Sequence, residues 1–124
     1  MNNTYTVEKL LDQIKNKPES VDFASVITTI SNHYNYQPVS FFNGSGSDIV
    51  TNVAGTNEGS CKIFAFAQMH NLTRDETLAC FGDYYRNDVL KNPDENDHAN
   101  IRTFIKYGWD GVIFSKSPLS PKNS

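Results

Sequence analysis

The chain has 124 residues, of which 38% are hydrophobic and 12% aromatic, and its formal net charge is −3 at pH 7. This length suits a single domain with one buried core. The acidic balance disfavours sequence-independent binding to nucleic acid or to an anionic membrane, because both depend on a basic surface. We therefore expect a protein or a small molecule as the partner, and neither nucleic acid nor a membrane.

Export and metal binding are not indicated by the sequence. The longest uncharged apolar run, residues 63–67, is too short to cross a bilayer. Residues 1–5 lack the basic and then apolar pattern of a secretory signal peptide. Cys61 and Cys80 have neither the spacing of a zinc site nor that of a disulfide framework. We expect reduced thiols, no metal site and no cofactor.

The first half of the chain predicts two helices followed by a hairpin. Apolar residues at helical spacing run from Val7 to Ile14 and end before Pro18. Ser20 is the predicted N-cap of a second helix that extends to about Asn35. Residues 39–42 and 49–51 favour strands, and a turn signal at residues 43–44 separates them.

The second half predicts three more helices and a short strand. The first, from about residue 58 or 60 to 69, is apolar on nearly every side and is the expected central helix. A capping box of Thr73 and Glu76 opens a helix that continues to Tyr85, and Asp97 caps a last helix that ends at Gly108. Gly82 inside the fourth helix indicates close backbone packing.

These elements define the expected fold class and domain boundaries. The strand at residues 112–114 is expected to join the hairpin. The fold class is α+β, with about five helices packed against a small antiparallel sheet of the hairpin and this C-terminal strand. Residues 1–115 form the predicted domain, and residues 116–124 form the predicted flexible tail.

Long motifs in this chain resemble the HopJ type III effector family. They are Phe42-Asn43-Gly44, Asn52-Val53-Ala54-Gly55, Gly59-Ser60-Cys61-Lys62 with Phe64-Ala65-Phe66-Ala67, residues 77–86, residues 97–102 and Gly108-Trp109. The resemblance covers about residues 7–114. It implies a bacterial protein, located in the cytoplasm or delivered to host cells by type III secretion. It implies no established enzymatic activity and no cofactor.

The catalytic hypothesis is that Cys61 is the nucleophile of a cysteine triad. A cysteine near a helix N-terminus faces unpaired N–H groups and the positive end of the helix dipole, which favour a thiolate. His98 and Asn100, or Asp97, supply the other residue types of a cysteine triad. The alternative is that Cys61 is a small buried side chain of the core, as free cysteines usually are.

Two binding hypotheses remain beside the catalytic one. The glycine-rich turn with Gly55, Asn57, Gly59, Ser60 and Lys62 could hold an anion at a helix start, although its glycines could equally serve backbone geometry alone.

Tyr84, Arg86 and Trp109 are residue types that anchor protein interfaces, and they also fill cores. The leading functional hypothesis is a protein-binding module, and the alternative is a cysteine-dependent hydrolase or transferase that uses Cys61 and His98.

Overall fold

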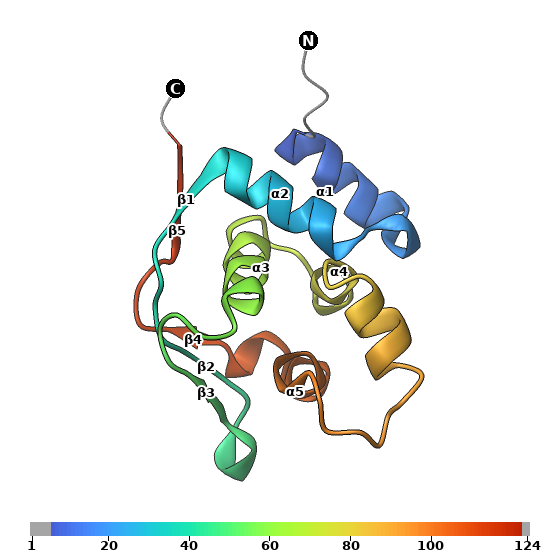
Figure 1. Ribbon diagram of the computed structural model, residues 1–124, viewed down its shortest axis with the longest axis vertical. Coiled ribbons are helices and arrows are strands. Elements are labelled where there is room, and N and C mark those ends of the chain that lie inside the picture. The colour runs from blue at the N-terminus through green and yellow to red at the C-terminus, as the bar shows by residue number, and fades with distance from the viewer. Residues whose placement is uncertain (1–5, 123–124) are drawn as a thin grey trace.

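The structure is a computed structural model and describes residues 6–122 (Figure 1). It has the predicted α+β fold, in which helices surround a central helix and small antiparallel sheets flank them. The helices are α1 (Val7–Asn16), α2 (Phe23–His33), α3 (Glu58–Met69), α4 (Arg74–Ala79) and α5 (Ala99–Tyr107). Short helical turns are η1 (Pro18–Ser20), η2 (Gly46–Asp48) and η4 (Gly108–Gly111), and η3 (Tyr84–Val89) is a π-helix.

The first two helices form as the apolar spacing predicts, with one cap displaced. Thr6 caps α1, and its side chain accepts a hydrogen bond from the Lys9 N–H at 3.0 Å. The predicted cap of α2, Ser20, instead ends η1. Asp22 caps α2, and its carboxylate accepts from the Ser25 N–H at 2.8 Å. Hydrogen bonds from the side chain and then the backbone of Ser25 lower the pKa of Asp22.

The predicted hairpin and its added C-terminal strand are both present. Strands β2 (Phe41–Asn43) and β3 (Val50–Asn52) pair antiparallel around η2, and β4 (Ile113–Phe114) pairs with the other edge of β2. Phe41 is buried and its neighbour Phe42 is 45% exposed. The alternation shows that one sheet face packs on the core, as the pleat of a strand requires.

Part of the segment expected as a tail, residues 119–121, forms a strand. Strand β5 (Leu119–Pro121) pairs antiparallel with β1 (Tyr34–Tyr36), which replaces the end of the predicted second helix. Leu119 is 4% exposed, so burial of its side chain accompanies the backbone pairing. The last two residues of the predicted tail, Asn123 and Ser124, lie outside the described residues.

Helix α3 is the centre of the core, as its composition predicts. In Figure 1 it lies between α2, α4 and α5 on one side and the strands on the other. Cys61 and residues 63–67 are all buried. The Phe64 ring lies near four other aromatic rings, those of Phe41, Phe81, Phe104 and Trp109.

The predicted fourth helix is broken in two. The capping box of Thr73 and Glu76 opens α4 with both reciprocal hydrogen bonds. The helix ends at Ala79, however, because Gly82 adopts φ +59°. A Cβ at Gly82 would lie 2.8 Å from the Phe23 backbone nitrogen, so the close packing indicated by this glycine is confirmed. The chain resumes as η3, which carries Tyr84 outward.

Helix α5 ends at Gly108, as predicted, but His98 and not Asp97 is its N-cap residue. His98 has φ 51°, a left-handed conformation that is uncommon outside glycine. Within residues 6–122, no helix has the length and apolar character needed to span a membrane.

Candidate functional site

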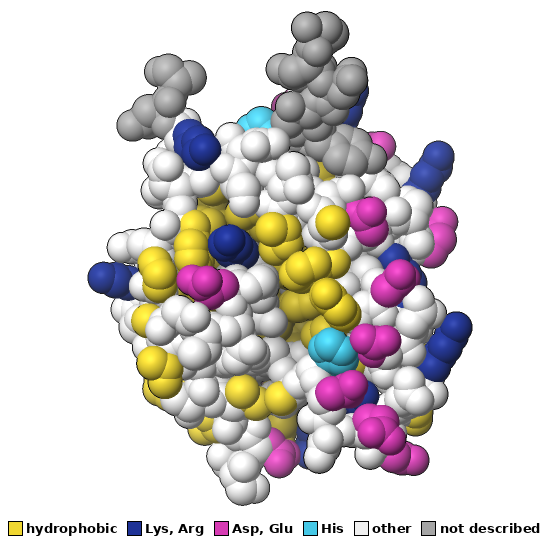
Figure 2. Space-filling view, viewed as in Figure 1, with side chains coloured by type: hydrophobic (Ala, Val, Ile, Leu, Met, Phe, Trp, Pro, Cys, Tyr) yellow, Lys and Arg dark blue, Asp and Glu magenta, His cyan; other side chains and the backbone are white. Residues whose placement is uncertain are grey.

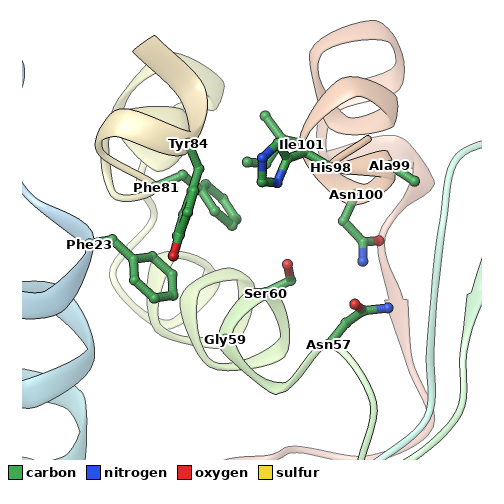
Figure 3. Close-up of a pocket in the computed structure, with 10 residues that line it drawn as sticks. All are labelled: Phe23, Asn57, Gly59, Ser60, Phe81, Tyr84, His98, Ala99, Asn100 and Ile101. Carbon is green, nitrogen blue, oxygen red and sulfur yellow. The ribbon is translucent and has the colours of Figure 1, made fainter. Parts of the chain in front are cut away.

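The candidate site is a cavity of about 420 Å³ between the start of α2, the start of α3, η3 and the start of α5. In Figure 2 apolar side chains fill a hollow on this face, and acidic side chains gather along one side of it. Figure 3 shows the lining residues, which come from all four segments. Its volume falls within the range of ligand pockets in proteins.

One wall of the cavity is aromatic. The rings of Phe23 and Tyr84 meet edge to face at 5.0 Å, and the Tyr84 ring lies 5.2 Å from that of His98. Tyr84 is nevertheless 43% exposed. Gly59 makes room for this wall, because a Cβ there would lie 2.9 Å from the Phe23 ring. The structure thus assigns Gly59 a packing role.

Two helices begin at this cavity. Asn57 and His98 are the N-cap residues of α3 and α5, both are left-handed, and neither side chain caps its own helix. Ser60 lines the cavity in the first turn of α3, with its hydroxyl directed inward, as Figure 3 shows. The N-terminal ends of α3 and α5, and with them the positive ends of two helix dipoles, therefore border the cavity.

A cluster of asparagines, which we call the asparagine network, fixes the two helix starts. Its members are Asn43, Asn52, Asn57 and Asn100. The side-chain oxygen of Asn100, Oδ1, accepts from the side-chain amides of Asn43 and Asn52, each at 3.1 Å. The side-chain nitrogen of Asn100, Nδ2, donates to the side-chain oxygen of Asn52 at 2.8 Å. Asn57 donates to Asn52 at 2.7 Å. The network joins strands β2 and β3 to both helices, so Asn100 is committed to structural hydrogen bonds.

His98 connects the cavity to acidic residues. Its Nε2 lies 3.0 Å from a carboxylate oxygen of Asp88 and 4.0 Å from one of Asp97. The hydrogen bond from Arg102 is the main reason that the pKa of Asp97 is lowered. Residues 6–122 contain no group of three or more His, Cys, Asp or Glu side chains suited to a metal ion.

Cys61 lies apart from this arrangement. His98 and Asn100 line the cavity and Cys61 does not. Cys61 is 1% exposed, and burial is the largest influence on its thiol and raises its pKa. Burial therefore opposes the activation that a position at a helix start would favour. Burial likewise raises the pKa of Cys80 to about 12.

We expect iodoacetamide to leave Cys61 unmodified in the folded protein and to modify it fully in denaturant, because a buried thiol with a raised pKa is inert. Mass spectrometry of the alkylated peptide across a pH series measures this, and Cys80 is the internal control because it too is buried. Labelling of folded Cys61 with an inflection well below the ordinary value of about 8.5 would contradict the expectation.

The remaining residues of the predicted anion-binding turn do not converge. Gly55 is exposed and takes φ +91°, so its conformation accounts for the glycine. The Lys62 ammonium lies 4.7 Å from the centre of the Tyr36 ring, and the Tyr36 hydroxyl donates to Glu58 at 3.0 Å. Lys62 does not line the cavity.

The three predicted interface residues also occupy different places. Arg86 donates to the carbonyl oxygens of Pro18 and Val21, which ties η3 to η1 and the start of α2. Trp109 donates to the Leu72 carbonyl at 3.0 Å, and its ring packs against the core. Only Tyr84 lines the cavity. Sequence reasoning missed Phe23, whose place in an apolar helical stripe gave no sign that it borders a cavity.

Comparison with known proteins gives a family and a structural relative. The model of the HopJ type III effector protein family matches residues 7–119. The crystal structure of VPA0580, described as a protein of unknown function, is 40% identical in sequence with a TM-score of 0.90. That alignment covers 98% of this chain and all of the other. A comparison with curated proteins found no match.

Proposed function

This chain belongs to the HopJ type III effector family, and we propose that it acts as a protein-binding module. A segment of the partner protein docks in the cavity between α2, α3, η3 and α5. Family membership supports type III delivery as the route by which the module reaches its partner.

The exposure of Tyr84 is the observation that carries this proposal. Its ring is held between Phe23 and His98, yet 43% of the residue stays accessible at the mouth of the cavity. A tyrosine fixed in this way can bury a large area against a partner at little cost in side-chain entropy. Anchors of protein interfaces are enriched in tyrosine for these reasons.

The hydrolase alternative lacks comparable support. Cys61 is buried with a raised pKa, whereas a nucleophilic cysteine needs access and a lowered pKa. Ser60 and His98 both line the cavity, but the Nε2 of His98 is hydrogen-bonded to Asp88 at 3.0 Å rather than to the Ser60 hydroxyl.

Selection of a random displayed peptide library on the immobilised protein tests the proposal. We expect Tyr84→Ala to weaken binding of the enriched peptides at least about tenfold, which corresponds to the loss of a typical interface anchor. Tyr107→Ala is the matched control, since Tyr107 lies at the other end of α5 and bonds Asp48. Equal binding to the wild type and Tyr84→Ala, or no enriched peptide at all, would overturn the proposal.

A further inference from the structure

We infer that the docking segment is basic, with lysine or arginine flanking an apolar side chain that enters the cavity. The inference rests on the proposed function and specifies the chemistry of the partner. It follows from the different character of the cavity and of the surface beside it, which we call the acidic border. The acidic border consists of Asp83, next to Tyr84 in the chain, Asp88 and Asp97, which lie close to His98, and Asp94 and Glu95 of the exposed loop that leads to Asp97.

The cavity itself is suited to an apolar group. Its lining residues include no Asp, Glu, Lys or Arg. Its apolar lining residues are Phe23, Phe81, Tyr84, Ala99 and Ile101. The starts of α3 and α5 border the cavity, and the positive ends of their helix dipoles disfavour a cation inside it. Cationic groups of a docked segment therefore belong outside the cavity.

Two residues of the acidic border are sequence neighbours of residues that line the cavity. Asp83 directly precedes Tyr84, and Asp97 directly precedes His98 in sequence. His98 also contacts Asp88 at 3.0 Å. All five border residues are exposed, so their carboxylates face solvent and any docked chain. Figure 2 shows the acidic side chains next to the apolar hollow.

Little positive charge in the chain offsets the border. Between residues 83 and 97 the basic residues are Arg86 and Lys91. Arg86 points inward to the carbonyl oxygens of Pro18 and Val21. Arg102 binds Asp97, but within residues 6–122 no ion pair reaches Asp83, Asp94 or Glu95. Charge complementarity at such a surface favours a basic segment and raises its association rate.

Three displayed peptide libraries test the inference in competition on the wild-type protein. They share one randomised apolar centre and differ only in flanking residues, which are Lys and Arg, Ser, or Glu. At low salt we expect the basic library to be enriched about tenfold over the serine library and the glutamate library to be depleted. Added salt reduces the preference, because surface charges are screened.

Two double variants test whether the preference for basic peptides depends on the acidic border. Asp94→Asn with Glu95→Gln removes two border charges that hold no ion pair, and we expect it to reduce the basic preference severalfold. Glu8→Gln with Glu19→Gln removes two exposed charges on α1 and η1 and is expected to leave the preference unchanged. An equal loss of preference in both double variants would contradict placement at the border.

The outcomes separate this inference from the proposed function. If the serine or glutamate library is enriched as strongly as the basic one and binding still depends on Tyr84, the basic segment is wrong and the docking site stands. If binding is independent of Tyr84, the docking site is wrong whichever library is enriched. Failure of all three libraries to bind contradicts both.

Discussion

Replacing Phe64 with alanine is expected to lower the free energy of unfolding by about 3–5 kcal/mol, the usual cost of truncating a buried phenylalanine. Phe64 is fully buried, and its ring lies 4.9 Å from that of Phe104 and 5.6 Å from that of Phe81. The truncation removes apolar burial and leaves a cavity that the surrounding helices can close only in part. A small domain has about 5–15 kcal/mol of stability, so the loss is a large fraction of the total.

Urea denaturation followed by circular dichroism measures the effect, with Phe42→Ala as the control. Phe42 is the same residue type in β2 but is 45% exposed, so its truncation is expected to cost less than about 1.5 kcal/mol. Equal destabilisation by the two variants would show that the packing around Phe64 does not determine stability.

Asn100→Ala is expected to cost about 2–3 kcal/mol, because it removes the side-chain acceptor that the buried amides of Asn43 and Asn52 share. Asn43 then keeps only the backbone carbonyl of residue 100, and Asn52 keeps only longer contacts, of 3.4 Å, to the carbonyls of Phe41 and Val50. It also removes the amide that donates to Asn52. Asn43 and Asn52 are 0% and 1% exposed, so the hydrogen bonds lost are buried ones. The loss should exceed that of an ordinary side-chain hydrogen bond.

Asn96→Ala is the control for this second prediction. Asn96 is exposed in the loop before α5, and its truncation is expected to change stability by no more than about 0.5 kcal/mol. Amide hydrogen exchange adds a local measurement, since loss of the network should lower protection in the first turns of α3 and α5. An Asn100→Ala protein as stable as Asn96→Ala would contradict a stabilising role for the asparagine network.

The sequence predicted the elements whose signals are local. The apolar run of α3, the capping box at Thr73 and the stop at Gly108 depend on neighbouring residues, and all three are present. Gly82 indicates close packing, but the backbone against which it packs belongs to Phe23 in another helix. Local propensity contains no information about that neighbour.

The candidate site was only partly predictable for the same reason. Asn57, Gly59, Ser60, Tyr84, His98 and Asn100 were singled out and do line one cavity. The sequence left two readings of Cys61 open because α3 is apolar on nearly every side, so periodicity could not show which face turns away from solvent. The asparagine network was missed because its members are distant in sequence, and single amides give no periodic signal.

The pairing of β1 with β5 has a consequence for how the chain acquires its fold. The side chain of Gln37 donates to the Ser117 carbonyl, 80 positions away, and Gln37 N–H donates to Pro118. During synthesis, β1 therefore has no partner until Leu119–Pro121 have been added. Such distant closure slows folding, because loop entropy is lost before the contacts form. The nascent chain thus exposes a lone edge until its last strand emerges.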